Sequence, residues 1–178
     1  MAAGAVWTVL EVDNCARCAM GDTSMRLVLD SLVALMLAGI LAGVTLHHRH
    51  ERAIEAKVKT TRSEIRRFHA QVMIQAAMEN VPLTQRGYPV SVEPAWFAGN
   101  RPTNLLLDSS YPWVEIAGEN ERDRLHPRRR MATSRSLAQF WYNPYQGVVR
   151  GRVPDSVSDA TALRLYNRIN DSDVARIY

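Results

Sequence analysis

The stretch "MRLVLDSLVALMLAGILAGVTLHHRHERAIEAKVKTTRSEIRRF" (residues 25–68) begins as an apolar run and ends as a charged segment, with no proline in between. In the twenty residues from Leu27 to Leu46, the polar side chains are Asp30, Ser31 and Thr45, and eleven residues are Leu, Ile or Val. Twenty helical residues are about 30 Å long, which matches the hydrocarbon core of a bilayer. A single Asp near one end does not outweigh eleven such residues. We therefore predict a transmembrane helix over residues 26–46.

A buried core helix and a cleaved signal peptide are the two alternatives for this run. A chain of 178 residues offers little protein in which to bury a helix that is apolar all round. A signal peptide ends in small residues, whereas the run ends in the bulky, charged "TLHHRHER". Residues 1–25 are expected to be an N-terminal leader or a disordered tail, with Met20 or Met25 as alternative starts.

Two cysteines, Cys15 and Cys18, precede the apolar run, and the sequence has no others. A disulfide framework is therefore not expected in the C-terminal part, which must fold by packing. The pair also matches half of a zinc site, but a second half with the required spacing is missing. We interpret it as incidental.

The segment after the apolar run has one apolar stripe. Its members recur at spacings of four and three residues: Ile54, Val58, Thr61, Ile65, Phe68 and Val72. Such a stripe forms either a coiled-coil seam or a face laid against a globular head, and two to three heptads are short for a coiled coil. Because "NVPLTQRGYP" ends the pattern, we favour the head, with an amphipathic stalk over residues 47–80. No Gly or Pro interrupts residues 44–79, which predicts one helix of about fifty residues, near 75 Å.

Residues 81–178 change character, because Pro and Gly become frequent and short β-like runs replace the helical period. "FWYNPYQGVVRGRV" predicts a strand, a turn and a second strand, and "YPWVEIAG" a further strand. "DSVSDATALRLYNRIND" predicts a short closing helix with a Ser or Asp cap. The expected fold class is α+β, with the long N-terminal helix packed on a small antiparallel β head.

The formal net charge is +4, and the densest basic cluster is "ERDRLHPRRRMATSR". Arg128, Arg129 and Arg130 are the candidate anion-binding loop within it, because clustered arginines grip phosphates. A solvated loop is the alternative, and it is favoured because no interleaved aromatic residues accompany the cluster.

Metal and catalytic motifs are sparse. His47, His48 and His50 lie beside Glu51, and His47 and Glu51 share a helix face. Because the sequence places no further Cys or His partner, we interpret them as polar interfacial residues and expect neither a metal nor a cofactor. No Gly-x-Ser-x-Gly motif, phosphate-binding loop or metalloprotease helix occurs, so the chain is not expected to be an enzyme.

Small residues create open faces on the apolar run. Gly39 and Gly43 are four residues apart, as are Ala34, Ala38 and Ala42. Another helix could approach closely at such a face. We therefore name Gly39 and Gly43, together with Asp30, as candidate assembly residues.

Residues 26–46, "RLVLDSLVALMLAGILAGVTL", resemble the N-terminal helix of type IV pilins and type II secretion pseudopilins. In that family an acidic residue is fifth in the mature chain and a Gly-Ile-Leu-Ala run follows nine residues later. With Arg26 first, Asp30 is fifth and "GILAG" is in register. "RGYPV" and "FWYNPYQGVVRGRVP" are similar to the head of pseudopilin-like proteins. The resemblance implies a pilin-like fold and a role for Asp30 in pairing with the terminal amine of a neighbouring subunit.

The sequence departs from the family pattern at three places. Met25 stands where prepilin peptidase requires Gly, Arg26 replaces the usual Phe, and the Pro that follows the "GILAG" region is absent. Processing and polymerisation therefore do not follow from the resemblance.

The function implied is that of a membrane-anchored structural subunit of a type II secretion or type IV pilus-like assembly. Its partners would be other pilin-like subunits, the assembly proteins and the lipid bilayer, in the inner (cytoplasmic) membrane. The family places the head in the periplasm, and we follow it. The positive-inside rule favours a cytoplasmic head instead, because seven basic residues follow the span: Arg49, Arg52, Lys57, Lys59, Arg62, Arg66 and Arg67.

Two other hypotheses stay open. One is a single-pass membrane protein that binds nucleic acid through the basic loop. The other is a membrane-bound metal site at His47, His48 and His50.

Overall fold

The computed structural model describes the backbone of residues 10–178 and the side chains of Met25 and residues 27–178. The chain divides into two compact units, the first ending at Glu51 and the second spanning Arg52–Tyr178, and each is described by itself. Of the predicted leader or tail, residues 1–9 lie outside the described residues, as do the side chains of Cys15 and Cys18. The backbone of residues 10–25 is helical. Whether these residues are removed stays a prediction.

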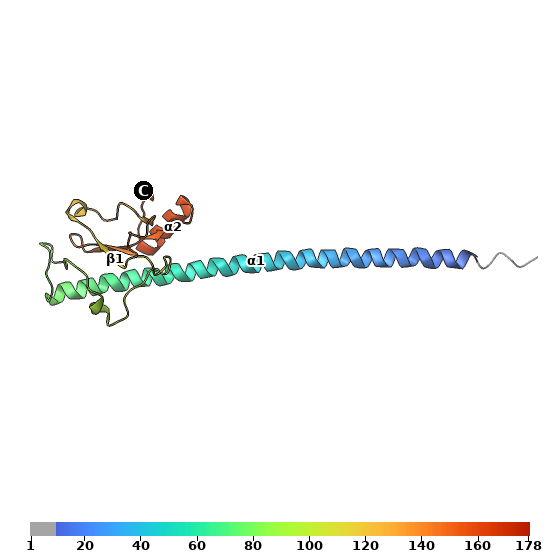
Figure 1. Ribbon diagram of the computed structural model, residues 1–178, viewed down its shortest axis with the longest axis horizontal. Helices are drawn as coiled ribbons and strands as arrows, with labels where there is room; N and C mark the ends of the chain where they lie inside the picture. Colours follow the sequence, from blue (N-terminus) through green and yellow to red (C-terminus); the bar gives the residue numbers. More distant parts are fainter. Residues whose placement is uncertain (1–9) are drawn as a thin grey trace, which may run out of the picture. The chain divides into compact units, whose positions relative to one another are not determined.

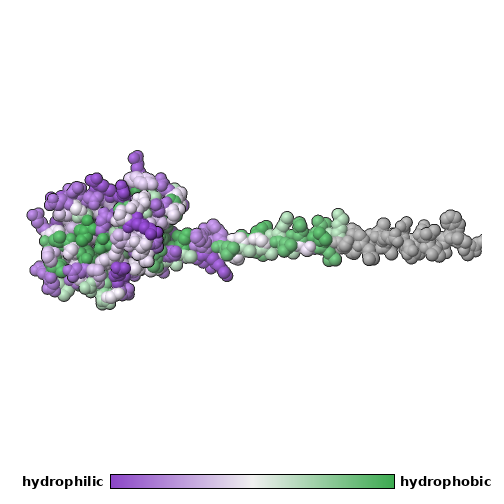
Figure 2. All heavy atoms as spheres, in the orientation of Figure 1, coloured by the Kyte–Doolittle hydropathy of each residue, from purple (hydrophilic) through white to green (hydrophobic). Residues whose placement is uncertain are grey.

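Helix α1 (Leu10–Met78) makes up the described part of the first unit and begins the second (Figure 1). Within the first unit, every residue whose side chain is described is exposed. Figure 2 shows hydrophobic residues along this part of the helix, followed by a hydrophilic stretch. The helix is long and apolar enough to cross a membrane, with a mean hydropathy of 2.3 in its most apolar window. The prediction that one helix carries both the apolar run and the stalk is confirmed, but the helix has 69 residues rather than about fifty, because it begins at Leu10.

The second unit is a small head around the rest of α1. Its elements are η1 (Pro94–Phe97), β1 (Val114–Ile116), η2 (Glu119–Glu121), β2 (Met131–Ala132), β3 (Phe140–Asn143), β4 (Val148–Gly151), β5 (Val153–Pro154) and α2 (Asp159–Asn170). A three-stranded sheet has the order β1-β3-β4, and β2 pairs with β5. The class α+β is therefore correct.

The prediction of an antiparallel head is wrong in part. Strands β3 and β4 form the expected antiparallel hairpin, with Trp141 opposite Arg150. Strand β1 pairs in parallel with β3, and β2 in parallel with β5, so the sheets are mixed. Residues 117–139 separate β1 from β3, which is long enough for the crossover that a parallel pair requires.

The apolar stripe of α1 packs on the head, as predicted, rather than forming an exposed seam. Val58, Ile65, Phe68 and Val72 are buried in one core with residues from the sheet and α2, whereas Ile54 at the start of the stripe is 36% exposed. Phe68 lies at the centre of this core, where its ring contacts Phe97, Trp113 and Phe140.

The closing helix was also predicted correctly. Helix α2 begins after Ser158, whose hydroxyl oxygen accepts a hydrogen bond from the backbone N–H of Thr161. This is the cap expected at a helix N-terminus. The helix buries Leu165, Tyr166 and Ile169 against the core.

Candidate functional site

The apolar helix segment is the first candidate site, because it exposes an extended hydrophobic surface. Leu35 is 73% exposed and Ile40 is 63% exposed. The hydroxyls of Ser31 and Thr45 each donate to a carbonyl three residues earlier, Val28 and Ala42, at 2.9 Å. Both hydroxyls are thus satisfied within the helix, and they do not oppose burial in lipid. Asp30 is the single ionisable residue between Leu27 and Leu46.

Asp30, Gly39 and Gly43 all lie on α1 in the first unit, and all three are exposed. A Cβ atom added at Gly39 or at Gly43 would meet nothing within 4 Å. The two glycines are one turn apart and therefore share a face. This face leaves the helix backbone open to close approach by another helix. Their role in assembly stays a prediction.

The predicted anion-binding loop does not present three free guanidinium groups. Arg128 lies 3.6 Å from a carboxylate oxygen of Glu121. Arg130 donates to the carbonyl of Arg176 at 2.8 Å, and its guanidinium carbon lies 5.9 Å from the ring centroid of Tyr166. Two of the three side chains thus have partners in the head. The side chain of Arg129 is exposed and has no hydrogen-bond or ion-pair partner among the described residues.

The histidines after the apolar run contact Glu51. His47 and His48 lie 3.3 Å and 3.6 Å from its two carboxylate oxygens, and all three side chains are largely exposed. Among residues with described side chains, no three His, Cys, Asp or Glu groups are arranged to hold a metal ion.

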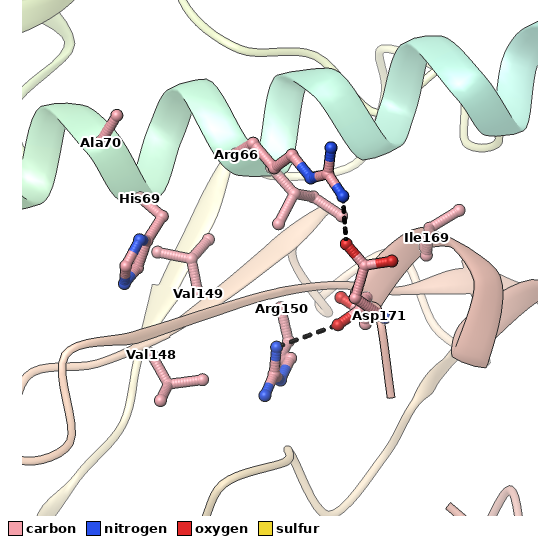
Figure 3. A pocket seen from close by; sticks show the side chains of 10 residues that line it. Arg66, His69, Ala70, Val148, Val149, Arg150, Ile169 and Asp171 are labelled. Carbon is pink, nitrogen blue, oxygen red and sulfur yellow. Dashed lines mark hydrogen bonds and ion pairs between the residues drawn. The ribbon is translucent and has the colours of Figure 1, made fainter. Parts of the chain in front are cut away.

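A pocket that sequence reasoning missed lies between α1, β4 and the end of α2, all in the second unit (Figure 3). We call it the Arg150 pocket. It has a volume of about 360 Å³, and its polar lining includes Arg66, His69, Arg150 and Asp171. The residues come from three elements far apart in the sequence. No local pattern therefore marked them.

Two arginines of α1 share one carboxylate beside this pocket. Arg62 and Arg66 both pair with Asp171, and the distance from Arg66 is 2.8 Å. Partial burial alone would raise the pKa of Asp171, but the hydrogen bonds from the two arginines outweigh it and hold the pKa below its usual value. Asp171 has a left-handed backbone at the C-terminal cap of α2. The ion pairs therefore link the end of α2 to α1.

His126 and Tyr166 form a second polar contact that the sequence did not indicate. Nδ1 of His126 lies 3.0 Å from the Tyr166 hydroxyl. Burial and the positive charges of Arg150 and Arg130 lower the pKa of His126 to about 4. The ring is therefore neutral at pH 7.

The lowered pKa of His126 predicts that the folded chain loses stability in mild acid. The pKa of His126 is lower in the folded chain than the ordinary value of 6.5, so protonation favours the unfolded state. The stabilisation is complete above pH 6.5 and is lost as the pH falls to about 4. Because the ring is partly exposed, we expect this loss to be about 1–2 kcal/mol in the free energy of unfolding. Denaturant unfolding of the full-length chain in detergent at pH 7, 5 and 4 measures it.

The control for that experiment is His126→Gln, which keeps a polar group near Tyr166 but does not titrate. The carboxyl groups of Asp108 and Asp171, whose pKa values lie below the ordinary value, are present in both proteins and so do not change the difference between them. The free-energy difference between them should therefore shrink toward pH 4. A difference that stays constant from pH 7 to pH 4 would refute the assignment.

No family model matches the chain, and neither a curated protein nor a solved structure matches it.

Proposed function

We propose that the chain is a membrane-anchored, pilin-like structural subunit of a type II secretion or type IV pilus-like assembly. The observation that supports this most is the exposed apolar surface of α1 between Leu27 and Leu46. Burying one Leu, Ile or Val side chain stabilises by about 1.5–3 kcal/mol. Eleven of them contribute on the order of 20 kcal/mol. Lipid or neighbouring helices therefore cover this surface in the working protein.

The head supports the same proposal. The segment of α1 from Arg52 onward is fixed to the head by buried side chains such as Val58, Phe68 and Val72. A subunit of this kind anchors by one part of a helix and displays a folded domain on the other part. We propose a structural role without catalysis, in the inner membrane, with the head on the periplasmic side.

Nucleic-acid binding has less support. Arg128 and Arg130 are engaged by Glu121 and by the carbonyl of Arg176, so the basic loop offers fewer free donors than its sequence suggests.

Asp30 is the residue through which we test the proposal. A carboxylate in an apolar helix bundle costs several kcal/mol until it meets a cation, so a charged partner on a neighbouring subunit would fix the register between helices. Asp30→Leu should leave membrane insertion intact and reduce association between subunits at least tenfold. Co-purification of two differently tagged full-length copies from detergent extracts measures this.

The matched control is Ser31→Leu, the same replacement one residue along the helix. Ser31 already satisfies its hydroxyl within the helix, so its loss should leave association within about twofold. Association of the Asp30 variant at the level of the unaltered chain would contradict the proposed function.

A further inference from the structure

In the Arg150 pocket, the guanidinium group of Arg150 forms no ion pair among the described residues, although the carboxylate of Asp171 also lines the pocket. Arg150 donates from Nε to the carbonyl of Leu125 at 3.1 Å and from a terminal nitrogen to the carbonyl of Asn170 at 3.2 Å. Both acceptors are neutral. By contrast Arg152, two residues along the chain, meets the carboxylate of Glu115 at 2.8 Å. A partly buried guanidinium group whose hydrogen bonds go only to carbonyls is a site where an anion would be stabilised.

The surroundings of Arg150 leave positive charge in excess. The nearby carboxylate, Asp171, is shared by Arg62 and Arg66. Figure 3 shows Arg66 extending along α1 to Asp171, while His69 projects from the same helix toward β4. Neither His69 nor the second terminal nitrogen of Arg150 has a hydrogen-bond partner among the described side chains and backbone. These groups are available as donors to a further ligand.

Strand β4 lies at the edge of the three-stranded sheet, so a ligand could bind either as an added strand or through a single side chain. Along β3 and β4, pairs of residues that hydrogen-bond to each other alternate with pairs that do not. Val149 and Gly151 belong to the second kind, so their backbone N–H and carbonyl groups point away from β3. The side chain of Asn170 already bonds both the N–H and the carbonyl of Gly151, at 2.8 and 3.0 Å. Val149 is 3% exposed. The edge is closed to an added strand, so the pocket takes a side chain.

We propose that the Arg150 pocket binds the carboxylate side chain of an Asp or Glu on a neighbouring subunit. Arg150 and Arg66 supply charged donors, and a ring N–H of His69 supplies a further donor. A volume of about 360 Å³ suits a side chain and its flanking residues, since it lies at the small end of ligand pockets. The apolar part of the lining, Ile65 and Val148, contacts the methylene groups of the incoming side chain. The choice of a subunit as the source rests on the proposed function.

The test uses the full-length chain in detergent micelles and a fluorescent, end-capped hexapeptide of alternating Glu and Ala. A hexapeptide with Gln for Glu is the neutral control. The Glu peptide should bind at least tenfold more tightly than the Gln peptide, as measured by fluorescence anisotropy. Equal binding of the two peptides would overturn the proposal.

Substitutions locate the binding. Arg150→Gln should weaken binding of the Glu peptide at least tenfold. Arg66→Gln, at a side chain that is 65% exposed, should weaken it about threefold or more. Arg168→Gln is the matched control, because Arg168 is also exposed and pairs with Glu55 outside this pocket. If Arg168→Gln weakens binding as much as Arg66→Gln, the effect is general charge attraction and the pocket assignment is wrong.

Two further arms identify the source of the carboxylate. Inorganic phosphate that binds while the Glu peptide does not would overturn the side-chain assignment. Association of tagged full-length copies should fall in Arg66→Gln. If the Glu peptide binds but full-length copies do not associate, the assignment of the carboxylate to a neighbouring subunit is wrong. If full-length copies associate but the Glu peptide does not bind, the proposal for the Arg150 pocket is wrong and the proposed function is unaffected.

Discussion

Arg152→Ala should lower the free energy of unfolding by about 3–5 kcal/mol, because it removes a large buried side chain and leaves two backbone carbonyls in the head without their hydrogen-bond donor. The Arg152 side chain is 2% exposed. It meets the carboxylate of Glu115 at 2.8 Å and donates to the carbonyls of Arg129 and Ala138, each at 2.9 Å. The substitution leaves these acceptors without their donor and opens a cavity. Denaturant unfolding of the full-length chain in detergent, followed by near-UV circular dichroism, measures the loss.

Two variants separate the causes of that loss. Arg152→Met keeps most of the volume and loses the donors, so a loss almost as large as that of alanine assigns the effect to hydrogen bonding. Arg168→Ala removes an exposed arginine that pairs with Glu55, and it should cost less than about 1 kcal/mol. A loss below 1 kcal/mol for Arg152→Ala would contradict the buried network.

Phe68→Ala should also cost about 3–5 kcal/mol, the range for truncating a buried aromatic side chain. Phe68 is fully buried, and its ring stacks on Trp113 with centroids 5.4 Å apart. It also meets Phe97 and Phe140 edge-on at 5.6 and 5.5 Å. Because Phe68 lies on α1 and the other three rings belong to the head, the substitution loosens the attachment of the head to the helix. The same unfolding measurement reports it.

Phe68→Leu is the milder control and should lose less than half as much, since it keeps part of the volume and remains apolar. Ile74→Ala, at a position that is 49% exposed on the same helix, should cost less than about 1 kcal/mol. If Phe68→Ala and Ile74→Ala cost the same, the stripe does not hold the head.

The sequence predicted those parts of the fold that depend on local periodicity. The apolar run is marked by its length and continuous hydrophobicity, and the stripe that ends at Val72 by its helical repeat; α1 contains both. The hairpin over Phe140–Gly151 was predicted from its Asn-Pro and Gly turn. In the structure, the side chain of Asn143 accepts from the N–H of Tyr145, and Gly147 has a positive φ. Each of these signals acts within a few residues of its position.

Features that depend on distant contacts could not be predicted in this way. The parallel pairing of β1 with β3 depends on where the crossover places a strand of three residues, which is too short to carry a pattern. The sequence also could not show the partners of the Asn143 side-chain amide, which donates to the carbonyls of Glu121, Arg122 and Arg124. The sequence left anion binding by the basic loop open beside the favoured solvated loop, and it could not show that Arg130 donates to the distant carbonyl of Arg176.

Alkaline carbonate extraction of cell membranes tests most directly the claim that the apolar part of α1 spans a bilayer. The full-length chain should remain in the membrane pellet and should enter solution only with detergent. A Leu35→Arg, Ile40→Arg double variant should shift to the supernatant, because each Arg near the helix centre opposes insertion by about 2.5–3.5 kcal/mol. Recovery of the unaltered full-length chain in the detergent-free supernatant would contradict the account.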